Sequence, residues 1–284
     1  MACTDPKKAW EYGLTENGKQ KMVFSRPEGV DWDPILLPCG KCVSCKLSYS
    51  REWATRITHE AQTSKLSCFL TLTYDEENLP DPPSVSKKEV QDFIKNLRQY
   101  LRRNVDDNIR FKYFACGEYG STRGQRPHYH IIILGWDFTD KRYWSKTDTG
   151  NINYRSPTLE KLWKKGFSTI GEVTYQSAGY VARYTFKKTK NPKKYEFTDI
   201  QSGEVKELEP EFLVMSQGIG LDWWKRYNTD TQKDYLTVNY QKQKVPRYYD
   251  KQLEKKDPEQ LAQIKERRVE NAKLRNEDVP RIVR

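Results

Sequence analysis

The chain has 284 residues, with 50 Lys and Arg against 39 Asp and Glu, so its formal net charge is +11. This charge favours a polyanionic partner, and the 18 Tyr and 8 Trp side chains could stack on the unpaired bases of a nucleic acid. No segment approaches the roughly 20 apolar residues of a membrane span, and no apolar run follows the amino terminus. We therefore expect an intracellular protein without a membrane partner, built as one catalytic domain with appendages.

A cluster of cysteines follows the first 38 residues, for which the lack of a clear period predicts irregular structure. Cys39, Cys42 and Cys45 have the spacing of a zinc knuckle, and Cys3 could supply the fourth ligand. His59 competes for this role but lies in a helix that we expect over residues 50–62. Because an intracellular compartment keeps thiols reduced, the cluster favours structural Zn²⁺ over disulfides, with unmetallated thiols or a redox pair as alternatives.

Alternating and helical apolar patterns predict the elements in the middle of the chain. Residues 67–73 and 110–116 alternate as β-strands. Between them, Ser86 and Glu89 have the spacing of a capping box and precede apolar residues at helical intervals, which predicts an amphipathic helix. Residues 127–135 begin at a proline, end at a glycine and are rich in Ile, so we expect a buried strand that pairs with 110–116 as a hairpin.

His128 and His130 lie two residues apart on this strand, so both imidazoles project from the same face. Glu118 lies near the end of the neighbouring strand and could complete a set of two nitrogens and one oxygen for Mn²⁺ or Mg²⁺. Asp75 and Glu172 are alternative third ligands. The competing interpretation is a pair of core histidines, but the chain has only 3 His, and two of them lie at strand spacing.

A second candidate motif lies on a helix that we expect over residues 179–188, after a helix over 156–165 and a strand over 166–173. Tyr180 and Tyr184 are four residues apart and share one helical face. They could be core aromatics, or nucleophiles if a metal or a positive charge assists the phenol. The nearby basic residues could bind phosphate groups; they are Arg183, Lys187 and Lys188.

Three segments occur in the order of the motifs of the HUH endonuclease superfamily, which the chain resembles. They are Phe-Leu-Thr-Leu-Thr at 69–73, His-Tyr-His at 128–130, and Tyr180 and Tyr184 with Lys187. Further segments resemble the replication initiators of the microviruses, and among them the gokushovirus group: residues 1–3, 39–45, 117–120, 126–130 and 246–250. One departure is Met-Ser-Gln-Gly-Ile-Gly at 215–220, where a Met-Ser-Arg stretch with a proline is expected, so no DNA contact is assigned there.

The resemblance implies an α+β fold with a central antiparallel sheet flanked by helices, the RRM-like or ferredoxin-like palm of HUH endonucleases. A cysteine-rich zinc element would occupy residues 1–62, the endonuclease core 63–200 and a helical C-terminal extension 201–284. Within the extension, apolar patterns predict a helix at 221–227, a strand at 235–240 and a final polar helix over 257–276.

The resemblance also implies an activity. In this family a tyrosine attacks the scissile phosphate of single-stranded DNA at the phage origin, forms a 5′-phosphotyrosine and frees a 3′-OH, which host polymerase extends. The product strand is later rejoined into a circle, in the cytoplasm of the bacterial host and with a host helicase as a further partner. The residues that take roles by this resemblance are the metal ligands His128, His130 and Glu118, the nucleophiles Tyr180 and Tyr184, and the DNA-orienting Lys187.

Two alternatives stay open at this point. A plasmid initiator, relaxase or transposase of the same superfamily would apply the same chemistry to another DNA element. A non-catalytic nucleic-acid-binding protein would use zinc to hold the amino terminus and the basic helix to grip DNA. In that second case, replacing Tyr180 and Tyr184 with Phe would leave every activity intact.

Overall fold

The structure of the chain is a computed structural model that describes residues 3–16, 20–120, 126–183, 195–199 and 202–274. It divides into two compact units, one formed by Met1–Glu52 with Arg226–Arg284 and the other by Trp53–Lys225. The first boundary falls inside helix α1, Val43–Thr63. Among the described residues, no helix combines the length and the apolar character that crossing a membrane requires.

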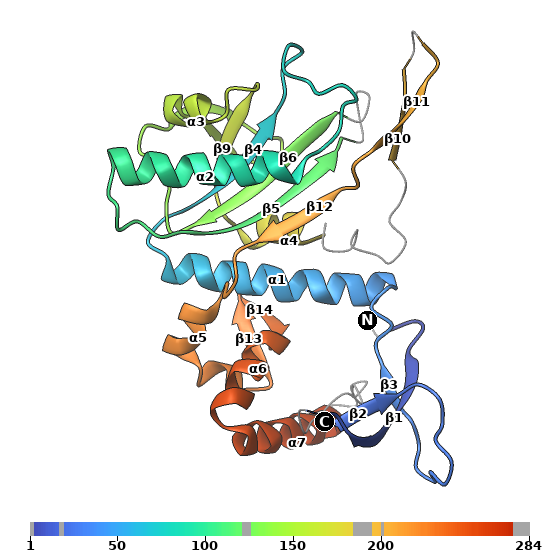
Figure 1. Cartoon of the computed structure of the whole chain (residues 1–284). Coiled ribbons are helices and arrows are strands. Elements are labelled where there is room, and N and C mark those ends of the chain that lie inside the picture. The colour runs from blue at the N-terminus through green and yellow to red at the C-terminus, as the bar shows by residue number, and fades with distance from the viewer. Residues whose placement is uncertain (1–2, 17–19, 121–125, 184–194, 200–201, 275–284) are drawn as a thin grey trace. The chain divides into compact units, whose positions relative to one another are not determined.

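An antiparallel sheet forms the centre of the unit Trp53–Lys225 and has seven strands in the part of the chain that the structure describes (Figure 1). In spatial order the strands are β12 (Phe212–Met215), β5 (Lys112–Tyr119), β6 (Pro127–Leu134), β4 (Ser67–Thr73), β9 (Ser168–Gly171), β8 (Ile152–Arg155) and β7 (Arg142–Lys146). The predicted hairpin is confirmed, because β5 pairs with β6 and places Glu118 opposite His128. Since β6 also pairs with β4, the histidine strand lies inside the sheet.

One face of this sheet packs against helices α2 (Lys87–Asn104) and α3 (Pro157–Leu162), which lie in front of it in Figure 1. The predicted capping box of α2 does not form: the Ser86 side chain makes no capping hydrogen bond, and the Glu89 carboxylate accepts from Lys165 Nζ at 2.6 Å. Burial therefore holds α2, at roughly 1.5–3 kcal/mol for each large apolar side chain. Those buried side chains are Val90, Phe93, Ile94, Leu97 and Leu101.

The opposite face packs against the part of α1 within this unit and against α4 (Tyr175–Arg183). Helix α4 begins four residues before the predicted start, because Thr174 and Ser177 cap it reciprocally. The Ser177 amide donates to Thr174 Oγ1 at 3.0 Å, and the Thr174 amide donates to Ser177 Oγ at 2.8 Å. The helix buries Ala178, Val181 and Ala182, which leaves Tyr180 half-buried beside the sheet.

The segment at 215–220 is tied to the sheet and to α1 by polar contacts. Lys112 Nζ on β5 donates to Glu60 Oε1 at 2.7 Å and to Asp222 Oδ2 at 2.8 Å. Glu60 is only 4% exposed, and its other oxygen accepts from the Gly220 amide at 2.6 Å. Arg56 Nη2 donates to the Ile219 carbonyl at 2.8 Å. These contacts hold the start of helix α5 (Leu221–Tyr227), whose predicted bounds are confirmed. A β-hairpin of β10 (Tyr195–Thr198) and β11 (Val205–Leu208) precedes β12.

The prediction of irregular structure over residues 1–38 is wrong. This segment forms the antiparallel strands β1 (Lys7–Leu14), β2 (Gln20–Val23) and β3 (Ile35–Leu37), in the order β2-β1-β3 among the described residues. The only buried residues of β1 are the adjacent Ala9 and Trp10, so the strand lacks the alternation that reveals a sheet. Its partner on one side is β3, where Lys7 pairs with Leu37 from far along the chain.

The same unit ends in short strands and helices. They are η2 (Asp230–Gln232), β13 (Tyr235–Val238), β14 (Gln241–Lys244), α6 (Arg247–Lys256) and α7 (Pro258–Leu274). The predicted strand at 235 and the predicted start of the final helix near Pro258 are confirmed. Helix α7 is fixed to α6 by an ion pair between Arg268 Nη1 and Asp250 Oδ1 at 3.1 Å. The predicted α+β fold, an antiparallel sheet flanked by helices, is therefore confirmed.

Candidate metal centre and its tyrosine

Glu118, His128 and His130 meet on the sheet face that α4 covers. The Oε1 atom of Glu118 lies 2.7 Å from Nε2 of His128 and 2.9 Å from Nε2 of His130. Glu118 is 3% exposed and His130 is 8% exposed, so the carboxylate is almost fully withdrawn from water. The hairpin register creates this cluster, because Glu118 faces His128 directly across the strands and His130 lies two residues farther along the same face.

The far nitrogen of each imidazole has its own partner. Nδ1 of His128 lies 3.1 Å from the Arg126 carbonyl oxygen, which can only accept, so this nitrogen carries a proton. Nδ1 of His130 lies 3.1 Å from Oγ1 of Thr71, the residue opposite His130 on β4. Such contacts orient a ligating imidazole and select the tautomer that leaves Nε2 free to bind a metal. Sequence reasoning missed Thr71, because its role depends on the pairing of β4 with β6.

Burial and pairing shift the pKa values of the cluster. Burial alone would raise the pKa of Glu118, but the hydrogen bonds from His128 and His130 outweigh it and lower this pKa to about 2. Burial lowers the pKa of His130 despite its bond to the carboxylate. Burial has the same effect at His128, but there the bonds to Glu118 and to the Arg126 carbonyl outweigh it and raise the pKa. Glu118 is therefore a charged ligand at neutral pH.

The Tyr180 phenol completes the cluster. Its hydroxyl donates to Glu118 Oε1 at 2.8 Å, and its ring meets the His130 ring edge-on with centroids 5.1 Å apart. Burial and the Glu118 charge raise the pKa of Tyr180, whereas the Arg183 guanidinium, 5.3 Å from the ring centroid, opposes this shift. The phenol is therefore neutral at physiological pH. Three predicted site residues lie outside the described residues: Tyr184, Lys187 and Lys188.

The residues present fit a divalent metal. A buried carboxylate needs a compensating positive charge, and two imidazole nitrogens beside it form a donor set that suits a first-row divalent ion or Mg²⁺. The three ligand atoms of Glu118, His128 and His130 all lie within 4.8 Å of one another. The alternatives Asp75 and Glu172 do not belong to this group, and the Asp75 carboxylate accepts instead from the backbone and side chain of Asn78.

A second group that could hold a metal lies in the unit with the chain termini. The Sγ atoms of Cys3, Cys39, Cys42 and Cys45 all lie within 4.8 Å of one another, and His59 is not part of the group. Cys39 Sγ accepts from the amides of Lys41 at 3.4 Å and Cys42 at 3.3 Å, around a turn that Gly40 makes at φ 71°. The backbone amides of Cys45 and Thr4 lower the pKa of Cys42 to about 5. This arrangement of thiol groups suits Zn²⁺.

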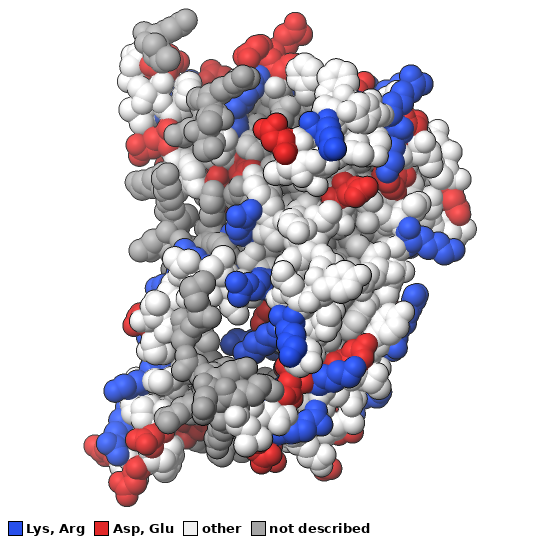
Figure 2. Space-filling model, turned by 180° about the vertical axis from the view of Figure 1, so that it is seen from behind, with Lys and Arg blue, Asp and Glu red and all other residues white. Residues whose placement is uncertain are grey.

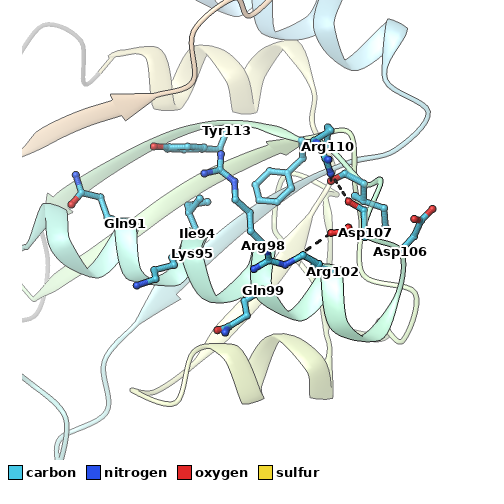
Figure 3. Close-up of a pocket in the computed structure, with 12 residues that line it drawn as sticks. Gln91, Ile94, Lys95, Arg98, Gln99, Arg102, Asp106, Asp107, Arg110 and Tyr113 are labelled. Carbon is cyan, nitrogen blue, oxygen red and sulfur yellow. Dashed lines mark hydrogen bonds and ion pairs between the residues drawn. The ribbon is translucent and has the colours of Figure 1, made fainter.

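A hollow of about 640 Å³ lies apart from the cluster, between α2 and the start of β5 (Figure 3). The Arg98 guanidinium carbon lies 5.3 Å from the Phe111 ring centroid in this hollow, and Arg102 Nε lies 4.0 Å from Asp107 Oδ1. Tyr113 lines the hollow from the sheet face that packs on α2, whereas its neighbour Phe114 packs with α4. The hollow is therefore on the other face from the histidines, and it is not part of the candidate metal centre.

Comparisons with known proteins agree on one family. The family of replication-associated proteins of the ORF2 type matches residues 67–189, a span that contains the metal cluster and Tyr180. Replication-associated protein ORF2 of Spiroplasma virus 4 is 36% identical over 249 residues, which cover 84% of the chain and 74% of that protein. Replication-associated protein VP4 of Bdellovibrio phage phiMH2K is 32% identical over 266 residues, covering 91% and 79%. Replication-associated protein ORF4 of Chlamydia phage 1 is 31% identical over 224 residues, covering 77% and 54%. No solved structure matches the chain.

Proposed function

Because the chain belongs to the replication-associated proteins of microvirus-type phages, we propose that it initiates rolling-circle replication by cutting single-stranded DNA at the phage origin. The cut is a transesterification in which a tyrosine oxygen replaces the 3′ oxygen of the DNA on the scissile phosphorus. The reaction takes place in the bacterial host cytoplasm, where polymerase and helicase of the host extend and open the template. On this proposal, the sheet with its histidine strand is the palm of an HUH endonuclease.

The observation that carries this proposal is the hydrogen bond of Tyr180 into the metal cluster. One carboxylate oxygen of Glu118 lies 2.8 Å from the phenol and 2.7 Å from an imidazole nitrogen. A core tyrosine needs only some acceptor, but this phenol lies beside an anion and two imidazoles on the open side of a helix. A scissile phosphate held at the cluster would therefore be within reach of the phenol oxygen.

The residues divide the chemistry among themselves. Glu118, His128 and His130 would hold Mn²⁺ or Mg²⁺, which when bound supplies Lewis acidity to a phosphate oxygen and orients the scissile bond. The Tyr180 oxygen forms a bond to phosphorus while the bond from phosphorus to the 3′ oxygen breaks, so a 5′-phosphotyrosine and a free 3′-OH result. The phenol loses its proton and the 3′ oxygen gains one. Arg183, beside the Tyr180 ring, favours the developing phenolate.

Rejoining needs a second attack. The sequence offers Tyr184 as the second nucleophile, with Lys187 and Lys188 as phosphate contacts. When the regenerated origin is cut by the second tyrosine, the new 3′-OH attacks the first phosphotyrosine and closes a circle. Each step exchanges one phosphodiester for another, so no ATP is required.

We also propose that the four cysteines hold a structural Zn²⁺. Cys3 precedes β1, whereas Cys39, Cys42 and Cys45 surround the start of α1, so one ion would join segments that are far apart in sequence. The amides that donate to Cys39 Sγ would stabilise it as a thiolate, the form that binds zinc.

The test is a covalent-adduct assay. The protein is incubated with Mn²⁺ and single-stranded circular phage DNA and resolved on a denaturing gel, beside Tyr180→Phe, Tyr184→Phe and the double variant. Tyr143→Phe is the matched control, because this tyrosine is 66% exposed. We expect a metal-dependent adduct that disappears only in the double variant.

Other outcomes would change the proposal. Loss of the adduct with one substitution alone would mean a single-nucleophile enzyme. Tight DNA binding without any adduct would favour the non-catalytic nucleic-acid-binding protein.

A further inference from the structure

The sheet face that carries the metal cluster continues across β4 to β9. Thr73 pairs with His128, and its amide and hydroxyl both donate to the Phe167 carbonyl oxygen, at 2.9 and 3.1 Å. Because neighbouring strands lie about 4.8 Å apart, the backbone of Phe167 is about 10 Å from that of His128. Phe167 precedes Thr169 by two residues, and Thr169 pairs with Thr71, so the Phe167 side chain is on the face of the cluster.

The same face continues onto β8. Tyr154 pairs with Ile170, and both side chains pack in the core on the α2 side of the sheet. The next residue, Arg155, therefore lies beside Thr169 and projects from the face of the cluster. No insertion or bulge separates β8 from β9 at the described pair, so the metal centre and Arg155 belong to one continuous surface.

Phe167 and Trp144 stand exposed on this surface with Arg155 between them. Phe167 is 63% exposed and Trp144 is 57% exposed. The Arg155 guanidinium carbon lies 4.8 Å from the Trp144 ring centroid and 5.8 Å from that of Phe167. Arg155 Nε also donates to Glu160 Oε1 at 2.8 Å, which fixes the guanidinium in place. The two rings are therefore held by regular strands and by one arginine, yet each keeps a face open to solvent.

We propose that Trp144, Arg155 and Phe167 form an aromatic platform on which unpaired bases next to the scissile phosphate stack. This inference rests on the proposed function, because it names the part of the surface that would receive the DNA beside the metal centre. An aromatic ring can stack on any base, and an arginine among the rings adds attraction to the phosphates. The platform would thus hold a single strand in line with the cluster while the base sequence is read elsewhere.

Charge favours single-stranded DNA as the occupant over an apolar protein segment. The platform carries a guanidinium, and the whole chain has a net charge of +11. Figure 2 shows this side of the molecule, where Lys and Arg residues are interspersed with uncharged surface. A duplex would not fit the stacking surface, because its bases are already stacked on one another. The platform therefore predicts a preference for unpaired DNA.

The experiment measures binding of a fluorescein-labelled oligodeoxythymidylate by anisotropy, to the full chain and to Phe167→Ala, Phe167→Leu, Phe167→Trp and Trp144→Ala. Tyr143→Ala is the matched control, because Tyr143 is 66% exposed on the same strand as Trp144 but pairs with Tyr154, on the opposite face. We expect Phe167→Ala and Trp144→Ala to bind roughly 5- to 100-fold more weakly. Phe167→Trp should bind like the unaltered chain, and Phe167→Leu should resemble Phe167→Ala, because Leu lacks an aromatic face.

A second measurement locates the contact. The oligonucleotide carries 5-iododeoxyuridine, which forms photoadducts with aromatic side chains stacked on it, and the linked residue is identified by mass spectrometry. Linkage to Trp144 or Phe167 supports the platform. Equal binding by Phe167→Ala, Phe167→Leu and the Tyr143→Ala control, with linkage elsewhere, overturns it.

The covalent-adduct assay separates this inference from the function on which it rests. An adduct formed normally by Phe167→Ala, together with unchanged oligonucleotide binding, would refute the platform and leave the initiator proposal standing. Binding that depends on Phe167 and Trp144 in a chain that never forms an adduct would refute the initiator and leave the platform as a site for single-stranded DNA.

Discussion

Replacing Thr71 with Val should weaken metal binding at the cluster although Thr71 is not itself a ligand. Val keeps the shape of the side chain but removes the hydroxyl, which lies 3.1 Å from Nδ1 of His130. Without metal, this contact is a hydrogen bond between neutral groups, worth about 1 kcal/mol. With metal on Nε2, the ring is polarised, and its Nδ1–H bond approaches the roughly 1.5–3 kcal/mol of a bond to a charged group. The difference of about 1–2 kcal/mol corresponds to a roughly 5- to 30-fold loss of affinity.

The assay is a titration of metal-free protein with Mn²⁺, followed by the paramagnetic resonance of the free ion. Thr71→Ser is the matched control, since it retains the hydroxyl and should keep most of the affinity. Thermal unfolding of the metal-free proteins shows whether the fold is intact. If Thr71→Val binds Mn²⁺ as tightly as the unaltered chain, the hydroxyl does not position His130, and the argument from the Nδ1 contact fails.

Three further changes test other parts of the structure. Glu118→Gln should abolish metal-dependent adduct formation; in the metal-free protein it should also reduce the acid-induced loss of stability between pH about 4.5 and 2, because a carboxylate with a lowered pKa stabilises the fold above that range and ceases to do so within it. Gly117→Ala should destabilise the fold by about 1–3 kcal/mol in urea unfolding, because a Cβ there would lie 2.5 Å from Phe212 Cε1, and Phe212→Leu should restore part of the loss. Cys42→Ser should eliminate zinc from the purified protein by elemental analysis and lower its melting temperature, whereas Cys68→Ser should leave the zinc content unchanged.

The elements that local patterns specify were predictable. The strand at 67–73 and the helix at 221–227 have the bounds expected from the sequence, because alternating residues or a short apolar turn mark both. Elements whose partners are distant in sequence were not. Trp10 lies in a strand that pairs with residues near 23 on one side and near 36 on the other, and no local period reveals those pairings. Ser86 has the right spacing for a capping box, but Lys165 competes for Glu89 from another part of the chain.

The candidate site divides in the same way. His128, His130 and Glu118 could be brought together from sequence, because they lie on two strands of one hairpin. Thr71 could not, since it needs the register of a strand that is separated from the hairpin by a helix. The aromatic platform needs the pairing of β8 with β9, and its residues have no motif of their own. The predicted roles of Tyr184, Lys187 and Lys188 stay predictions.

The origin of the ligands in each candidate metal site determines what removing the metal would do. Glu118, His128 and His130 come from interior strands whose backbones are held by neighbours on both sides. An ion there could enter and leave within a rigid frame, so a chelator should silence the chemistry reversibly. Cys3 and Cys45 come from segments that the ion itself would join, so zinc release would wait for local unfolding and would be slow. One chain would thus contain an exchangeable ion for activity and a slowly exchanging ion for structure.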